Sequence, residues 1–419
     1  MNMASPCATA SARSKERDKT LGLRSFFDRI EPQFLKGGRY EKFFPVYEMV
    51  ESFIYTPKTV TTAAPHARSY IDMKRIMTYV VLATIPCILF GMYNTGLQTN
   101  MAIAEYGASG WRAAIIETLG IGFDPNNPFA NIMHGLLYFL PIYVVTLVAG
   151  GIFEVIFAVV RGHEVNEGFL VTSMLYTLIL PATTPLWQVA LGIIFGVVIG
   201  KEVFGGTGKN FLNPALVGRA FLYFAYPAYM SGDSIWTPVD GFSGATALAI
   251  GASDGVAAFP ERGIEWMDAF VGTIQGSFGE TSTLAILIGL AFLLIVKIAN
   301  WRLIVGCLGG MIAFSTLLNW IGSDTNPMFA MPWYWHLVVG GYAFGLAFMV
   351  TEPVSASHTN MGRYIYGALI GFMVVMIRVI NPAFPEGMML AILFGNVFAP
   401  LIDHFVVQAN IKRRAKRNV

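Results

Sequence analysis

A short polar loop in a very apolar chain carries residues whose types and spacing could do chemistry. Residues 240–246 read D-G-F-S-G-A-T, so Thr246 lies six residues after Asp240, with small residues directly before it. A hydroxyl is a weak nucleophile unless it is activated, so this pattern suits an acceptor that another enzyme modifies, with Asp240 binding a metal or accepting a proton. The alternative is a helix N-cap, because Thr246 precedes the helical pattern ALAIGAS. Spacing alone favours the cap.

A second polar stretch, GKEVFGGTGKNFLNPALVGRA, occupies residues 200–220. It is not a nucleotide-binding loop, because Lys209 is followed by Asn210 where the Walker pattern needs serine or threonine. Asn210 and Asn213 would place amide groups just inside the bilayer, which is costly unless they are paired with a ligand or with backbone. We favour a ligand over a tight cytoplasmic turn.

Charged residues in apolar runs are candidate functional sites, because a central charge costs roughly 2.5–3.5 kcal/mol on insertion scales. Glu154 and Asp403 could bind Na⁺ through carboxylate oxygens or carry protons. Lys201, Lys297 and Arg378 are instead expected to extend their charged ends to the membrane interface.

The pair Gly150-Gly151 leaves a gap without side chains beside two phenylalanines. A flat ring could lie against that backbone. Close helix packing is the other explanation for such a pair, and it is the one that the residues alone favour.

The composition identifies the class of protein. The chain has 419 residues, of which 55% are hydrophobic and 13% charged, and its mean hydropathy is +0.56. A soluble protein normally carries about 25% charged residues, so we predict an integral membrane protein in the lipid bilayer. The three cysteines are far apart and the histidines show no helical pairing, so we predict no iron–sulfur or other metal site, no disulfide framework and no haem. We expect no cleavable signal peptide and no nucleic-acid partner.

A helix needs about 20 apolar residues to cross a membrane, and ten apolar runs reach or nearly reach that length. Because backbone groups in lipid must be satisfied internally, we predict an all-α polytopic membrane protein with about ten transmembrane helices. The runs are 76–95, 132–160, 168–181, 186–204, 211–230, 283–299, 302–320, 334–351, 364–380 and 388–408.

The placement of Lys and Arg predicts the topology. Residues 1–75 contain 13 Lys and Arg, and residues 411–417 contain five, so both termini should be cytoplasmic. The acidic loop 231–282 then lies on the outer side, after the fifth span.

That loop divides the chain into two five-helix halves. Each half contains a proline-rich break, LPATTP at 180–185 and TEPVSAS at 351–357, followed later by an Asn-Pro pair. Paired breaks predict a 5+5 inverted repeat with a site at its interface. The predicted division is an N-terminal cytoplasmic segment 1–75, a first half 76–230, the loop 231–282, a second half 283–408 and a basic tail 409–419.

Several long motifs resemble the B-type subunit of the bacterial Na⁺-translocating NADH:quinone oxidoreductase. The resemblance covers nearly the whole chain, through FFPVYEMVESFIYTP, APHARSYIDMKR, RGHEVNEGFLVT, PLWQVALGIIFGVVIGKEVFGGTGKNFLNPALVGRA, DGFSGAT, FMVTEPVSASHTNMGRYIYG and NVFAPLIDHFVV. The D-type subunit of Rnf electron-transport complexes is related, but it is less similar at RGHEVNEGF and PLWQVALG.

The resemblance implies that a flavin transferase attaches FMN through a phosphoester to Thr246, the last residue of a motif that includes Asp240, Ser243, Gly244 and Ala245. It also implies further site residues: Asn210 and Asn213 for a noncovalent riboflavin, Gly150 and Gly151 for ubiquinone, and Glu154 and Asp403 for Na⁺. None of these is expected to be a catalytic side chain.

By the same resemblance, the chain would assemble with five other subunits in the bacterial inner membrane and pass electrons from FMN through riboflavin to ubiquinone while Na⁺ is exported. It should not oxidise NADH alone, because it lacks a dinucleotide-binding fingerprint. The alternatives are a secondary transporter without a redox role, which would not need DGFSGAT, and a D-type subunit of an Rnf complex.

Overall fold

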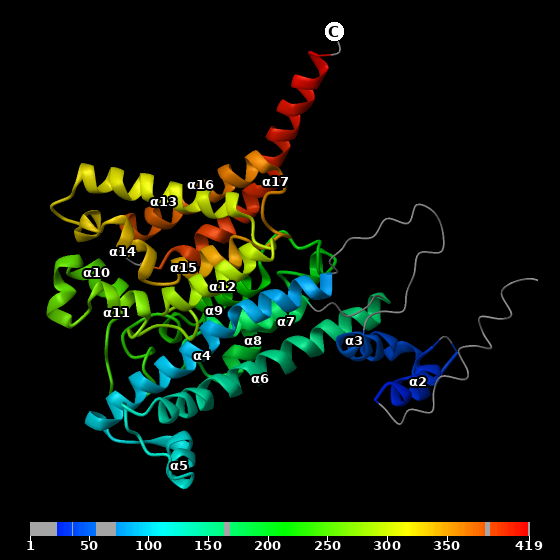
Figure 1. The fold of residues 1–419 in the computed structure, drawn as a ribbon, viewed down its shortest axis with the longest axis horizontal. Helices are drawn as coiled ribbons and strands as arrows, with labels where there is room; N and C mark the ends of the chain where they lie inside the picture. Colours follow the sequence, from blue (N-terminus) through cyan, green and yellow to red (C-terminus); the bar gives the residue numbers. More distant parts are fainter. Residues whose placement is uncertain (1–22, 36, 56–72, 163–167, 382–385, 418–419) are drawn as a thin grey trace, which may run out of the picture. The chain divides into compact units, whose positions relative to one another are not determined.

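The computed structural model describes residues 23–35, 37–55, 73–162, 168–381 and 386–417 (Figure 1). All regular structure in these residues is helical and none of it is β-strand, which confirms the all-α prediction. Such helices satisfy their own backbone groups, as a protein in lipid requires.

The described chain forms two compact units. The first contains the short helices α2 and α3 together with the last turns of α6, from Glu154 onward. The second contains the remaining elements and every site residue discussed below except Glu154. The five-part division of the chain and the membrane sidedness stay predictions.

The elements before the loop alternate between long and short helices. They are α2 (Leu23–Phe34), η1 (Glu41–Phe43), α3 (Phe44–Ile54), α4 (Met73–Tyr106), α5 (Gly110–Thr118), α6 (Pro128–Arg161), α7 (Gly168–Leu178), α8 (Leu186–Val198), η2 (Glu202–Phe204), α9 (Pro214–Ala225) and η3 (Pro227–Tyr229).

The loop itself folds into short helical turns before the second series of long helices. The elements are α10 (Ala247–Ser253), η4 (Val256–Ala258), η5 (Pro260–Arg262), α11 (Trp266–Val271), α12 (Thr283–Ile295), α13 (Trp301–Ile321), η6 (Pro327–Ala330), α14 (Trp333–Val338), α15 (Tyr342–Phe344), the π-helix η7 (Gly345–Met349), α16 (Asn360–Ile380) and α17 (Met388–Ala415).

Among the described residues, six helices are long and apolar enough to cross a membrane: α4, α6, α8 extended through η2, α13, α16 and α17. This is consistent with a polytopic membrane protein, but the count of ten spans is not confirmed. Helices α7, α9 and α12 have 11, 12 and 13 residues, which at 1.5 Å per residue is about 17–20 Å, short of the ~30 Å hydrocarbon core.

The eighth predicted span is broken into α14, α15 and η7. Broken and half-length helices are tolerated at membrane depth only where other protein surrounds them. Most residues of α7 and all five of η7 are buried, as that rule demands. Both elements end at the proline-rich breaks that the sequence marks.

Helix α9 begins where it does because of its first two residues. The side-chain oxygen of Asn213 accepts from the backbone N–H groups of Ala215 at 3.0 Å and Leu216 at 3.2 Å. Pro214 follows at the first helical position, where its missing N–H costs nothing. The second Asn-Pro pair ends α16 at Asn381, and its proline lies outside the described residues.

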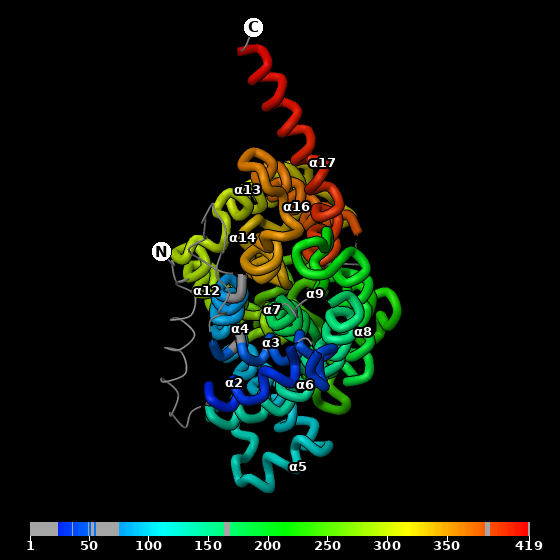
Figure 2. Tube along the Cα trace, turned by 90° about the vertical axis from the view of Figure 1, so that its right-hand side faces the viewer, coloured from blue at the N-terminus to red at the C-terminus, as the bar shows by residue number. Residues whose placement is uncertain are grey.

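Helices of the two predicted halves contact each other at corresponding positions. Helix α4 contacts α12, and α9 contacts α17; α8 with α9, and α16 with α17, form a further matching pair of contacts. Figure 2 shows α12 beside α4, and α17 extending past the other helices at its C-terminal end. The inverted repeat itself stays a prediction.

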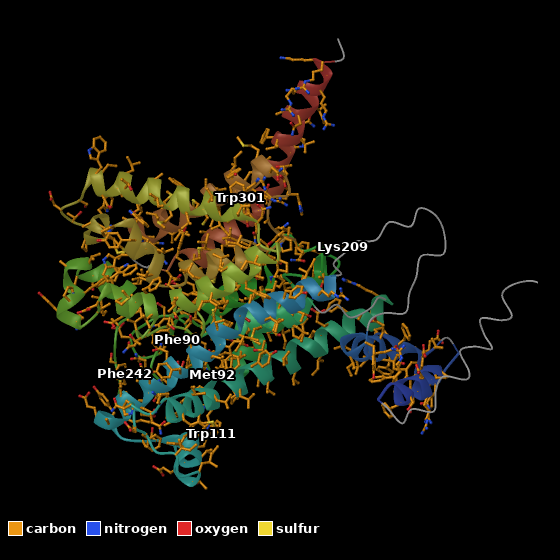
Figure 3. All side chains as sticks on the ribbon, viewed as in Figure 1. Phe90, Met92, Trp111, Lys209, Phe242 and Trp301 are labelled. Carbon is orange, nitrogen blue, oxygen red and sulfur yellow. The ribbon has the colours of Figure 1, made fainter. Side chains whose placement is uncertain are left out.

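The polar stretch 200–220 and the loop 240–246 lie at opposite ends of α4. Figure 3 shows Lys209 toward the first turns of α4 and Phe242 toward its last turns. At the far end, the rings of Tyr106 and Phe242 are 5.9 Å apart; at the near end, Ile76 lines the same cavity as Asn210. A helix of 34 residues is about 51 Å long, so a membrane's depth separates the motifs.

Arg378 and Lys201 correct the expectation that these cations reach the interface. The Arg378 side chain is 0% exposed and donates to the carbonyls of His336 at 2.8 Å and Val339 at 3.0 Å. Its guanidinium also lies 3.6 Å from the Glu386 carboxylate. Lys201 is buried beside Glu202. The expectation was wrong because these cations find partners inside the protein, which removes the need to reach water.

Replacing Arg378 with methionine should leave the partly buried Glu386 carboxylate without its cation, and the carbonyls of His336 and Val339 without their donor. We expect a loss of about 3–5 kcal/mol in the free energy of unfolding, measured by denaturant titration in detergent micelles. Lys297→Met is the control, because Lys297 is exposed and should change stability little. Equal stability of the two variants would contradict a structural role for the buried pair.

Candidate functional site

Thr246 is the N-cap of α10. Its backbone is extended, and its Oγ1 accepts from the N–H of Ala249 at 3.2 Å. The N-cap interpretation is therefore confirmed. It does not exclude modification, because an ester oxygen at this position can still accept that hydrogen bond.

A cavity of about 490 Å³ opens beside Thr246, within the ~300–1,000 Å³ typical of small-molecule sites. Its walls come from α9, α10, the loop before α12, the segment after α14 and the start of α17. The lining residues that matter below are Arg219, Tyr223, Trp236, Thr246, Leu248, Gln275, Ser277, Glu280, Thr281, Val339, Gly340, Glu386 and Met389.

A buried ion pair lies in the wall of this cavity. Nη1 of Arg219 is 3.2 Å from Oε1 of Glu280, and the hydroxyl of Ser277 donates to the same carboxylate. Burial raises the pKa of the Glu280 carboxyl, and the neighbouring Arg219 opposes that rise. The pair joins α9 to the segment that leads into α12.

The carboxylate of Glu386 lies near that of Glu280, with Gly341 between them. Glu386 accepts from the N–H of Gly341 at 2.9 Å, and a Cβ added at Gly341 would overlap the Glu280 carboxylate. Glu386 is in turn paired with Arg378. Two Arg–Glu pairs, each with a buried arginine, therefore meet at this end of the bundle.

Arg219, Glu280 and Glu386 were not predicted as site residues from the sequence. Arg219 lies inside the apolar run 211–230, which is the same signal that selected Glu154 and Asp403. The pairing of Arg219 with Glu280 gives no local signal, because the residues are 61 positions apart.

The cavity fits an aromatic group that carries polar atoms, such as FMN. Its walls are largely apolar and include the aromatic rings of Tyr223 and Trp236. Within the described chain the buried Oε1 of Gln275 and Oγ1 of Thr281 have no hydrogen-bond partner. Buried polar atoms are normally paired, so these two have hydrogen-bonding capacity that the described chain does not use.

The other six residues of the DGFSGAT motif shape the loop and do not line the cavity. Asp240 is exposed, and its Oδ2 accepts from the hydroxyl of Ser109 at 2.8 Å. The N–H of Gly244 donates to the carbonyl of Asp233 at 2.9 Å. Ser243 is exposed and Ala245 is half-buried.

Asn210 and Asn213 lie together at the opposite end of α4, in a cavity of about 60 Å³. Nδ2 of Asn213 donates to Oε2 of Glu352 at 2.9 Å, and Nδ2 of Asn210 donates to the carbonyl of Leu212 at 3.0 Å. This cavity is far below the usual ligand range, and the amides are engaged by protein. A role for Asn210 and Asn213 in riboflavin binding stays a prediction.

Glu352 instead links the two predicted halves at this end. Its Oε2 accepts from Asn213 of the first half and, at 2.7 Å, from the hydroxyl of Ser355 in the proline-rich break of the second half. Glu352 directly follows the predicted span 334–351. Its partner Asn213 is 139 positions away and could not be read from the sequence.

Gly150 and Gly151 lie on α6, next to α7 and α8. A Cβ at Gly150 would be 2.5 Å from two ring carbons of Phe169 and 3.0 Å from Ile193. At Gly151 the nearest atom would be 3.6 Å away, which is ordinary contact. A flat ring does lie against this backbone, but it belongs to Phe169 of the same chain.

Gly150→Ala should force Phe169 to move, whereas Gly151→Ala should not. We expect the first variant to lose about 1–3 kcal/mol of stability through overpacking and the second to remain near the parent protein. Thermal unfolding in detergent, followed by the fluorescence of a thiol-reactive dye, would measure both. A Gly151→Ala variant that is less stable than Gly150→Ala would contradict this packing.

Glu154 and Asp403 lie on two different helices, α6 and α17, and Glu154 follows Gly150 by one helical turn. Glu154 is buried. Asp403 accepts hydrogen bonds from the hydroxyls of Ser357 and Thr359 at 2.7 and 2.6 Å and from the N–H of His358 at 2.7 Å. Asp403 thus fixes α17 to the start of α16. A role for either carboxylate in Na⁺ binding stays a prediction.

Comparison with known proteins identifies the family. A family described as NQR2, RnfD, RnfE matches residues 60–412. The chain belongs to the NQR2, RnfD, RnfE family.

Relatives within this family cover nearly the whole chain. A protein of Ectopseudomonas mendocina (strain ymp), named as the B-type subunit of a Na⁺-translocating NADH-quinone reductase, is 64% identical over 404 residues, which are 95% of this chain and all of that relative. A protein of the same name from Stutzerimonas stutzeri (strain A1501) is 62% identical over the same shares. Another from Chromohalobacter salexigens is 62% identical over 95% of this chain and 97% of its own length. The resemblance to the B-type subunit is therefore confirmed.

Proposed function

We propose that this chain is a membrane flavoprotein subunit of a redox-driven Na⁺ pump, an NADH:quinone reductase that works as a translocase, and that it carries FMN as a phosphoester on Thr246. The observation that carries the proposal is the position of Thr246 at the wall of a 490 Å³ cavity with unpartnered polar atoms. The relatives' shared name supports the rest, since a Na⁺-translocating quinone reductase must move electrons and ions together.

The chain's own residues would hold and orient the flavin, which supplies one-electron and two-electron transfer when it is bound. Thr246 fixes one end at the loop, the apolar and aromatic wall receives the ring, and Gln275 and Thr281 offer polar atoms to it. Electrons would leave toward ubiquinone. An electron crossing the low-dielectric core is compensated when a cation crosses with it, and Na⁺ export would provide that compensation.

The wider assembly follows the same proposal. The chain would join five other subunits in the bacterial inner membrane, after a flavin transferase has loaded Thr246. Ten spans in an inverted 5+5 repeat, with both termini cytoplasmic, would put the Thr246 loop on the periplasmic side. Contacts of riboflavin with Asn210 and Asn213, and of ubiquinone with Gly150 and Gly151, stay predictions, and we derive no step from them.

The two alternative functions, a secondary transporter and a D-type subunit of an Rnf complex, differ in whether they require a flavin on the Thr246 loop. A secondary transporter has no use for a modified threonine that lines a ligand-sized cavity. A D-type subunit of an Rnf complex would carry flavin too, but the full-length relatives above are named as the B-type subunit of the quinone reductase.

Thr246→Asn separates the proposed attachment from helix capping. Asparagine is a good N-cap but has no hydroxyl, so the variant should fold normally and carry no covalent flavin. Thr246→Ser keeps both the cap and the hydroxyl and should retain at least part of the flavin. The chain would be produced with its flavin transferase, separated on a denaturing gel and viewed under ultraviolet light.

Mass spectrometry of the peptide spanning 231–262 would then place the added mass. The proposal predicts a gain equal to FMN minus water on Thr246 in the parent chain and none in Thr246→Asn. If the parent chain shows no in-gel fluorescence although it was produced with an active transferase, the proposal is contradicted. The transporter without a redox role would then be the favoured alternative.

A further inference from the structure

Arg219 is the one cation among the described residues that line the Thr246 cavity. The other charged lining residues are the carboxylates Asp233, Glu280 and Glu386. Asp233 is exposed, and Glu386 is paired with Arg378 behind the wall. Electrostatic support for negative charge inside the cavity would therefore have to come from Arg219.

The guanidinium of Arg219 is only partly engaged by protein. Within the described chain its hydrogen bonds involve Nη1 alone, which lies 3.2 and 3.5 Å from the two oxygens of Glu280. Arginine has five N–H donors in a fixed fork. The Nε and Nη2 donors are thus left for a group that enters the cavity, while the carboxylate of Glu280 holds the side chain in place.

The position of the pair relative to Thr246 decides which part of an attached flavin it meets. Thr246 is half-buried in the loop, where a phosphoester would be attached. Arg219 and Glu280 are buried, with side chains 11% exposed, on α9 and at the entrance to α12. Because Thr246 and the pair line the same cavity, a ring attached at Thr246 that occupies the cavity would meet the electric field of the pair.

We infer that the Arg219–Glu280 pair sets the reduction potential of the group held on Thr246. Arg219 raises the potential, because a cation stabilises the negative charge that the group gains with an electron. Glu280 lowers it, because a carboxylate opposes the same charge. Preorganised charges act strongly in a site from which water is excluded. The inference rests on the proposed flavin at Thr246.

The test is a spectroelectrochemical titration of the full chain, matured by flavin transferase and purified in detergent. The spectrum of Thr246→Asn is subtracted, so that only the covalent flavin is followed. Arg219→Gln should make one-electron reduction about tenfold less favourable, a shift of about 59 mV to lower potential. Glu280→Gln should shift the potential in the opposite direction by a similar amount.

Arg219→Lys is the matched control, because it keeps a cation at the same position and should hold the potential near that of the parent. A merely structural role for the pair would not give shifts of opposite sign in two variants that each remove one partner. If Arg219→Gln does not fold, Glu280→Gln alone decides. A flavin reduction potential above that of the parent supports the inference, and an unchanged or lower potential overturns it.

In-gel fluorescence separates the two possible failures. Variants that carry covalent flavin at the parent's potential would overturn the inference and leave the proposed function intact. A parent chain without covalent flavin would overturn both.

Discussion

Buried charge in an apolar interior is tolerated only when it is paired, and that requirement organises both ends of this helical bundle. At one end, Arg219 pairs with Glu280 and Arg378 with Glu386, so that α9, α16 and the entrances to α12 and α17 are tied together. Removing one partner of such a pair leaves an uncompensated charge, which is strongly destabilising. The Thr246 cavity takes its shape from the elements that these pairs join.

The opposite end uses a carboxylate and amides for the same purpose. Asn213 caps α9 with its oxygen and donates its amide to Glu352, so one side chain both starts a helix and binds a segment of the other predicted half. The cavity there is about 60 Å³, against about 490 Å³ at Thr246. One end of the bundle is thus tightly closed by polar contacts, and the other has room for a ligand.

Hydropathy and local patterns predicted the class of fold and several local features. The apolar runs gave helices because lipid leaves the backbone no other partner, and the N-cap at Thr246 follows from residue type and position. The N-cap at Asn213 was not predicted, because that residue was assigned to a ligand. Helix lengths could not be predicted, because hydropathy is the same for a helix that spans and for one that stops at a buried break. The partners of Arg378 and Arg219 were also hidden, because long-range pairing leaves no trace in local sequence.

The two polar ends of the bundle should lie on opposite faces of the membrane, and the proposed function depends on that arrangement. Single-cysteine labelling tests it directly, with Met267→Cys in the loop and Lys209→Cys in the GGTGKN turn, both in a Cys7→Ala background. Met267 and Lys209 are exposed, whereas Cys87 and Cys307 are buried. A membrane-impermeant maleimide should label Met267→Cys from outside intact spheroplasts and Lys209→Cys only after they are permeabilised. Labelling of both positions from the same side would contradict the arrangement.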